Sequence, residues 1–171
     1  LTPADIALLG GSGTHACFCP TTERDLGDGI GPSRELHAAG SPLTFGSDSH
    51  AVVDPFEEMR ALELDERLAT RERGHWASEE LLVAATVHGH RSLGFPDAGR
   101  IEAGARADLV VLDTGSPTLA GTGDGIAPVV FAATAADVRR VMVDGRWVAG
   151  IEDRAGVGAD LRAAIERVWE D

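Results

Sequence analysis

Lysine, asparagine, glutamine and tyrosine are absent from this chain of 171 residues, so that all 15 cationic side chains are arginine. No run of about 18 apolar residues occurs, so the sequence predicts no membrane-spanning helix. No charged and then apolar leader opens the chain, so we expect no secretory signal. A start at Leu1 instead of Met leads us to expect a fragment or a processed chain. The net charge of -13 and the pI of about 4.7 argue against non-specific nucleic-acid binding, which needs a basic surface.

Cysteine is scarce, because Cys17 and Cys19 are the only two in the chain. In a strand, residues two apart lie on the same face, and a disulfide between them has poor geometry. Two cysteines without a second pair do not make a zinc site. We therefore expect buried, reduced thiols in a cytoplasmic protein.

The length of 171 residues predicts one domain of ordinary size, and the hydrophobic content of 43% argues against general disorder. Helices and strands alternate in the first half of the chain, as in a parallel sheet. In the second half, Asp144-Gly145 predicts a type I′ turn and therefore antiparallel strands. The expected elements are helices over residues 2–9, 32–39, 78–93 and 159–169 and a long helix from 55, strands over 15–20, 42–45 and 108–113, a hairpin over 138–148, and loops over 21–29 and 114–127.

Asp48 is the first candidate for a functional residue. It lies in the stretch Gly46–His50, directly after a short apolar run that predicts a buried strand. A carboxylate at the C-terminal end of a strand lies where a (β/α) barrel keeps its chemistry. An Asp between a strand and a helix is also a common turn former or helix N-cap, so both interpretations remain open.

Three motifs in the chain resemble those of one enzyme superfamily. Cys19–Gly29 resembles the loop after the seventh barrel strand, and Gly46–His50 resembles the end of the eighth. Gly99–Val110 resembles the return from the barrel into a neighbouring β-sandwich. On these motifs the chain is identified as a member of the amidohydrolase superfamily, in its cytosine-deaminase-like branch. Cys19–Gly29, with residues 63–68 and 74–76, resembles more narrowly the formimidoylglutamate deiminase family of histidine degradation.

The resemblance implies an α/β fold, in which the chain forms the C-terminal part of a (β/α)8 metal-dependent hydrolase barrel. This part comprises about the last two βα units and is followed by β-sandwich strands and a C-terminal helix. It implies barrel residues at 1–98, sandwich strands at 99–150 and the helix at 151–171. It also implies a small-molecule substrate, no nucleic-acid or membrane partner, and a homodimer for the full-length protein.

The resemblance gives Asp48 two roles in the full-length enzyme, as a ligand of one divalent metal, usually zinc, and as the acceptor of a proton from the attacking water. The implied reaction converts N-formimidoyl-L-glutamate to N-formyl-L-glutamate and ammonia. His50 could hydrogen-bond near the metal, and capping of the next helix explains it equally well. Thr22 and Glu23 could line the mouth of the pocket or belong only to the loop. Relatives that deaminate nucleobases tend to have Asn at the position of Glu23.

Other residues have weaker functional interpretations. Arg24 could meet a substrate carboxylate, although a surface ion pair is the more common role. His88 and His90 lie two apart on an expected helix, where their side chains point in different directions. The family's other histidine ligands have no counterparts in the chain, so we expect the isolated chain to be inactive. The alternatives are another amidohydrolase of the same branch, such as a nucleobase deaminase or a chlorohydrolase, and a non-catalytic remnant.

Overall fold

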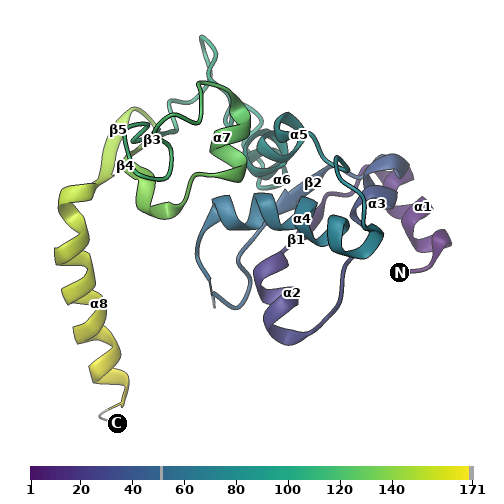
Figure 1. Cartoon of the computed structure of the whole chain (residues 1–171), viewed down its shortest axis with the longest axis horizontal. Coiled ribbons are helices and arrows are strands. Elements are labelled where there is room, and N and C mark those ends of the chain that lie inside the picture. Colours follow the sequence, from purple (N-terminus) through teal and green to yellow (C-terminus); the bar gives the residue numbers. More distant parts are fainter. Residues whose placement is uncertain (51, 170–171) are drawn as a thin grey trace.

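The first half of the chain is built around two short parallel strands. The computed structural model describes residues 1–50 and 52–169. Within it, Ala16 pairs with Leu43 and Phe18 with Phe45, so the expected parallel alternation is confirmed (Figure 1). The elements of this half are α1 (Pro3–Ser12), β1 (Ala16–Phe18), α2 (Pro20–Leu26), α3 (Ser33–Ala39), β2 (Leu43–Phe45) and α4 (Pro55–Thr70).

A helical segment continues from α4 and closes over β2. It consists of α5 (Ser78–Val83), a π-helical turn η1 (Ala84–His88) and α6 (Gly89–Ser92). The Nδ1 atom of His88 lies 3.3 Å from the carbonyl oxygen of Leu43, which ties this segment to the strand. The main apolar core lies between the strands and these helices and includes Phe18, Leu36, Leu43, Phe56, Met59, Leu62, Trp76 and Leu81.

Helix α4 carries a fully buried carboxylate, that of Glu63. The side chain accepts hydrogen bonds from the backbone N–H groups of Gly74 (2.9 Å) and Trp76 (2.7 Å) and from Arg67 (2.7 Å). Burial acts to raise the pKa of Glu63, but these hydrogen bonds outweigh it and lower the pKa. Glu63 therefore fixes the chain that leads from α4 to α5.

The second half of the chain forms an antiparallel sheet of three strands in the order β3-β4-β5. The backbone at the Asp144-Gly145 turn has φ angles of 49° and 76°, as a type I′ turn requires, so the predicted hairpin is confirmed. The bounds are β3 (Leu109–Leu112), α7 (Ile126–Phe131), a 3-10 turn η2 (Ala135–Asp137), β4 (Val138–Val143) and β5 (Arg146–Gly150).

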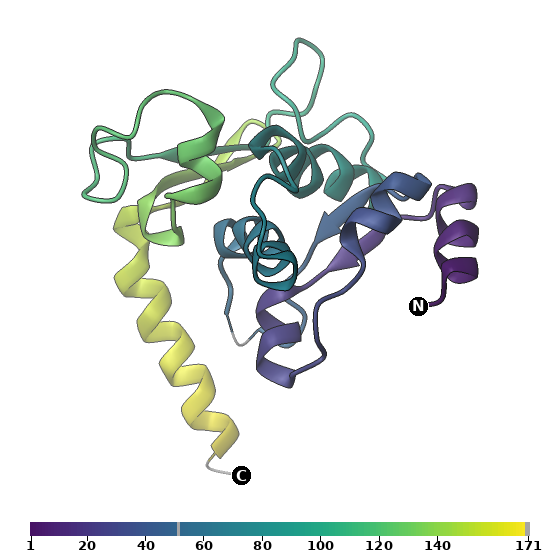
Figure 2. The same ribbon diagram turned by 45° about the vertical axis from the view of Figure 1, so that its right-hand side comes forward.

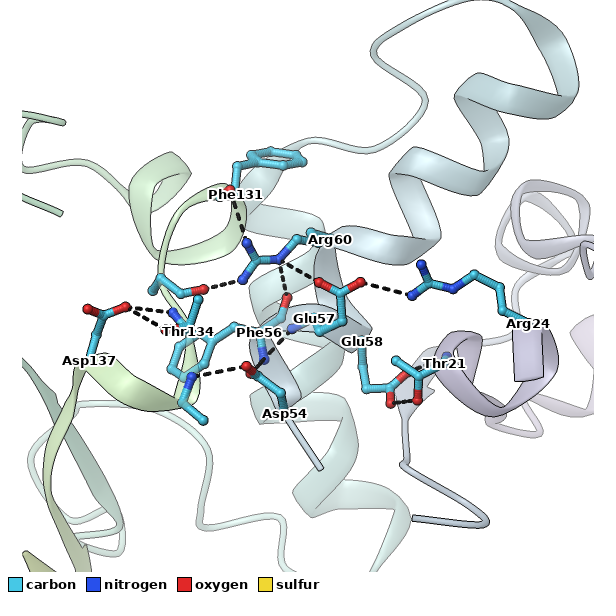
Figure 3. A network of polar contacts seen from close by, with 12 residues as sticks. Thr21, Arg24, Asp54, Phe56, Glu57, Glu58, Arg60, Phe131, Thr134 and Asp137 are labelled. Atoms are coloured by element: carbon cyan, nitrogen blue, oxygen red, sulfur yellow. Dashed lines mark hydrogen bonds and ion pairs between the residues drawn. The ribbon is translucent and has the colours of Figure 1, made fainter. Parts of the chain in front are cut away.

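Polar contacts from α4 join the two halves (Figure 3). Asp54 caps α4 by accepting from the N–H of Phe56 (2.9 Å), and its second oxygen accepts from the N–H of Ala135 (3.0 Å). The guanidinium of Arg60 donates to the carbonyl oxygens of Phe131 (3.2 Å) and Ala133. The segment before β4 is thus hydrogen-bonded to the first two turns of α4.

The chain ends in a short 3-10 turn, η3 (Ile151–Asp153), and the long helix α8 (Arg154–Trp169), which extends away from both halves (Figures 1 and 2). The predicted C-terminal helix is confirmed, and it begins five residues before 159. None of the described residues of α8 is buried. Within the described part of the chain, no helix is both long enough and apolar enough to cross a membrane.

Two sequence-based predictions about the first half are wrong. Residues 20–26 form the helix α2 instead of a loop, because Pro20 starts the helix and the Glu23 side chain accepts a hydrogen bond from the N–H of Cys19 (2.8 Å). Cys17 is exposed instead of buried, since the open face of β1 leaves it uncovered, and Cys19 is half-buried. Both cysteines are free thiols, as expected.

Candidate active site

The candidate site lies at the C-terminal ends of the two parallel strands. Each strand leads there into a polar segment, β1 into α2 and β2 into the loop Gly46–His50. Asp48 and His50 both have left-handed backbone conformations, with φ angles of 49° and 58°. Both side chains are exposed. The parallel pairing therefore brings Asp48 to the same end of the sheet as α2.

Gly46 allows this loop to pass close to the chain after β1. Its N–H donates to the carbonyl oxygen of Phe18 (3.1 Å). A Cβ atom at position 46 would lie 3.2 Å from the Sγ of Cys19 and 3.3 Å from the Sγ of Cys17. Glycine is thus the residue that lets the two sulfur atoms pack against the start of the Asp48 loop.

Thr22 connects α2 to the loop on both sides of Asp48. Its side chain is almost completely buried, with 1% exposed. The hydroxyl group donates to the carbonyl oxygen of Ser47 (2.7 Å) and accepts from the N–H of Ser49 (3.2 Å). It also lies 3.0 Å from the hydroxyl oxygen of Ser49. Thr22 was predicted either to line the mouth of the pocket or to belong only to the loop, and its contacts tie two segments of backbone together.

Glu23 and Cys19 lie beside this connection. Burial raises the pKa of Glu23, against the opposing effect of the hydrogen bond from the N–H of Cys19. Burial also raises the pKa of the Cys19 thiol to about 12, and Cys17, Asp48 and Glu23 add to the increase. Cys19 is therefore protonated at neutral pH and is a poor nucleophile there.

The structure bears on the alternative interpretations of His50 and Arg24. The cap of the next helix is Asp54, so the expectation that His50 caps this helix is wrong. Arg24 forms an ion pair with Glu57 at 2.9 Å, which supports its interpretation as a surface pair (Figure 3). The guanidinium of Arg24 also donates to the carbonyl oxygen of Pro20 (3.2 Å), at the start of its own helix.

The described residues do not by themselves form a metal site. Over residues 1–50 and 52–169, no group of three or more His, Cys, Asp or Glu side chains has the geometry to hold a metal ion. His88 and His90 each use Nδ1 near a backbone carbonyl oxygen, of Leu43 and Thr86 respectively. Asp48 is thus one carboxylate that could serve as a ligand, without the further donors that a tightly bound zinc ion needs.

Sequence reasoning identified Asp48 and Thr22 but missed Ser47 and Ser49. These two residues supply the backbone carbonyl and N–H groups that Thr22 binds. The available signal was the pair of small hydroxyl residues on either side of Asp48, next to a glycine.

Comparison with known proteins assigns the family. The model of the Amidohydrolase family matches residues 1–148 of the chain. The chain belongs to the amidohydrolase family. A formimidoylglutamate deiminase of Pseudomonas aeruginosa is 39% identical over 98% of this amidohydrolase chain. The chain spans only 39% of the length of that relative.

Other curated relatives of this amidohydrolase act on other molecules, according to their names. A 5-methylthioadenosine/S-adenosylhomocysteine deaminase of Halobacterium salinarum is 35% identical over 97% of the chain, which spans 38% of its length. An 8-oxoguanine deaminase of Pseudomonas aeruginosa is 36% identical over 95% of the chain, which spans 36% of its length.

Solved structures support the fold. An adenosine deaminase from Xanthomonas campestris with bound zinc has a TM-score of 0.88 and 28% identity. That match covers all of this amidohydrolase chain (100%) and 41% of the solved chain. The atrazine chlorohydrolase of Arthrobacter aurescens, complexed with zinc, has a TM-score of 0.78 over 95% of the chain and 38% of its own length. Its identity is 22%, so that match bears on the fold alone.

Proposed function

We propose that this amidohydrolase chain is the C-terminal portion of a metal-dependent deiminase that hydrolyses N-formimidoyl-L-glutamate to N-formyl-L-glutamate and ammonia. The observation that carries the proposal is the position of Asp48, at the C-terminal end of β2 and beside α2. In a (β/α) barrel, this end of the strands holds the catalytic residues. We extend the proposal to the architecture, with β1 and β2 as the last two barrel strands.

The similarity to a formimidoylglutamate deiminase supports the choice of substrate. That relative is 39% identical to the chain, whereas the two other deaminases described above are 35% and 36% identical. Glu23 supports the same choice, because nucleobase deaminases of this branch tend to have Asn at its position. An acidic chain with a net charge of -13 does not by itself attract an anionic glutamate moiety. We expect any arginine clamp for the substrate in the portion of the deiminase's length that this chain does not span.

The chemistry that we propose for Asp48 is proton transfer. A carboxylate near the attacking water can accept its proton as the oxygen adds to the formimidoyl carbon. Transfer of the protons of the water to the formimidoyl nitrogen then breaks the C–N bond and releases ammonia. The described residues contribute this carboxylate but no group of three metal-binding side chains. The further ligands of a zinc ion would therefore come from the portion of the deiminase's length that this chain does not span. His50 and Glu23 would border the site, in a homodimeric protein of the cytoplasm.

The test is a comparison of substrates with the complete polypeptide encoded by the reading frame that contains residues 1–171. Ammonia release is measured with N-formimidoyl-L-glutamate, 5-methylthioadenosine, S-adenosylhomocysteine and 8-oxoguanine, each with added zinc. We expect the highest kcat/KM with N-formimidoyl-L-glutamate. A preference for a purine compound would instead support a deaminase of the kind named among the relatives, and no turnover of any substrate would support a non-catalytic remnant.

A further inference from the structure

Within its own loop, the backbone around Asp48 has a turn hydrogen bond, from the N–H of His50 to the carbonyl oxygen of Ser47 (3.3 Å). Asp48 adopts φ = 49°, a left-handed conformation that non-glycine residues adopt at a cost in free energy. Its side chain is exposed and, among the residues that the structure describes, has no hydrogen-bond or ion-pair partner. Beyond that turn hydrogen bond, neither the intrinsic backbone preference nor the carboxylate itself holds the residue in place.

Thr22 provides further support from α2. Its hydroxyl group donates to the carbonyl oxygen of Ser47, and the N–H of Ser49 donates to it, so the residues on both sides of Asp48 are held by one oxygen atom. Thr22 is 1% exposed, so water does not readily replace these hydrogen bonds. Ser47 and Ser49 follow Thr22 by 25 and 27 residues in the sequence, so these hydrogen bonds are tertiary contacts.

Helix α2 is itself held in place, so Thr22 is a fixed point. The adjacent Thr21 donates from its backbone N–H (3.1 Å) and from its hydroxyl group (2.5 Å) to the buried carboxylate of Glu58 (Figure 3). Glu58 belongs to α4, whose first turn is capped by Asp54. The loop of Asp48 is thus connected through Thr22 and α2 to the longest helix of the first half.

We propose that Thr22 is a positioning residue for Asp48, which fixes the direction of the carboxylate through the backbone of Ser47 and Ser49. This inference rests on the proposed function, because it takes Asp48 as the group that accepts a proton. A side-chain hydroxyl that both donates and accepts a hydrogen bond is needed, which serine can also supply and valine cannot.

The first test measures the contact itself in the 171-residue chain. We expect the amide hydrogen of Ser49 to exchange with solvent faster in Thr22→Val than in the wild type, and at close to the wild-type rate in Thr22→Ser. The coupling constant between the amide and α hydrogens of Asp48 should change in Thr22→Val only. Unchanged exchange and coupling in Thr22→Val would overturn the proposal.

The second test measures catalysis in the complete polypeptide. A small misplacement of a reacting group can cost on the order of 10²-fold in rate, so we expect Thr22→Val to lower kcat by about that factor with little change in KM. Thr22→Ser should restore most of kcat. The control is Ser33→Ala, which removes the fully buried hydroxyl that donates to Glu66 (2.6 Å) and does not touch residues 47–49. If lost stability alone mattered, Ser33→Ala would lower kcat in the same way, and the proposal would fail.

The variant Asp48→Asn separates this proposal from the proposed function. If Asp48→Asn retains full activity, the role of Asp48 is wrong, whatever the exchange data show for Thr22. If Asp48→Asn is inactive while Thr22→Val has the kcat of the wild type, the proposed function stands and the positioning role of Thr22 is wrong.

Discussion

Two aspartates illustrate how the surroundings of a side chain decide its use. Asp137 is 3% exposed and accepts hydrogen bonds from the hydroxyl of Thr118 (2.8 Å) and from the N–H (2.8 Å) and hydroxyl of Thr134. The hydrogen bond from Ser116 contributes most to lowering its pKa, and the total effect, against burial, brings the pKa to about 2. Asp48, by contrast, is exposed at the end of a strand. Asp137 is therefore a structural carboxylate, whereas the carboxylate of Asp48 is accessible, as its proposed role requires.

The hydrogen bonds of Asp137 predict a loss of stability in acid. Because its pKa in the folded chain, about 2, is below the ordinary 3.8, the charged form stabilises the folded state above 3.8. That contribution is lost as the pH falls from 3.8 through about 2. We expect Asp137→Asn to lower the free energy of unfolding at pH 7 by about 1–2 kcal/mol and to flatten its acid dependence. Urea unfolding at several pH values measures both effects, with Asp28→Asn, at an exposed position, as the control. An equally steep acid dependence in Asp137→Asn would contradict this assignment.

At the scale of elements, helix α1 contains two adjacent glycines with opposite surroundings. A Cβ atom on Gly10 would overlap the carbonyl group of Ala39, where α1 packs against α3. A Cβ atom on Gly11 would have no described atom within 4 Å. The same substitution at neighbouring positions therefore tests the packing of α1 directly.

We expect Gly10→Ala to lower the free energy of unfolding by about 1–3 kcal/mol, because the helix must move away from α3. Gly11→Ala should raise it by about 0.5–1 kcal/mol, since alanine loses less conformational entropy in a helix. Chemical denaturation of the two variants measures both changes. Equal effects of the two substitutions would show that α1 does not pack against α3 in this way.

Local sequence patterns predicted the elements that depend on local interactions. The apolar residues of β2 and the Asp144-Gly145 turn each indicated their structures, and both are confirmed. Helix α2 was missed because Thr21, Thr22 and Glu23 show no apolar periodicity. Its start at Pro20 is local, but Thr21 and Thr22 also bind Glu58 and Ser47, which lie far along the sequence. The contact from Thr22 to Ser47 and Ser49 was also out of reach, because no local pattern reports a pairing between residues 25 or more positions apart.

At the scale of the whole molecule, Cys17 on the parallel sheet is exposed, and none of the described residues of α8 is buried. Within the described residues, β1 and β2 form a sheet of two strands. Leu161 and Val168 on α8 are 59% and 73% exposed. Free strand edges and apolar helix faces are surfaces that favour association. Such exposed surfaces are expected of a chain that spans only 39% of the length of its deiminase relative.

The proposed role of Asp48 also has its test at this scale, since catalysis would need residues beyond those of the described chain. Ammonia release from N-formimidoyl-L-glutamate is measured with added zinc for the isolated chain and for the complete polypeptide, each with and without Asp48→Asn. The matched control is Asp28→Asn, which changes an exposed carboxylate in the segment after α2. We expect no turnover by the isolated chain, clear turnover by the complete polypeptide and by its Asp28→Asn variant, and a loss of about 10³-fold or more in Asp48→Asn, within the range of effects of general acid–base catalysis. Zinc-dependent turnover by the isolated chain would contradict the need for residues beyond it. Wild-type rates in the Asp48→Asn variant of the complete polypeptide would contradict the proposed role of Asp48.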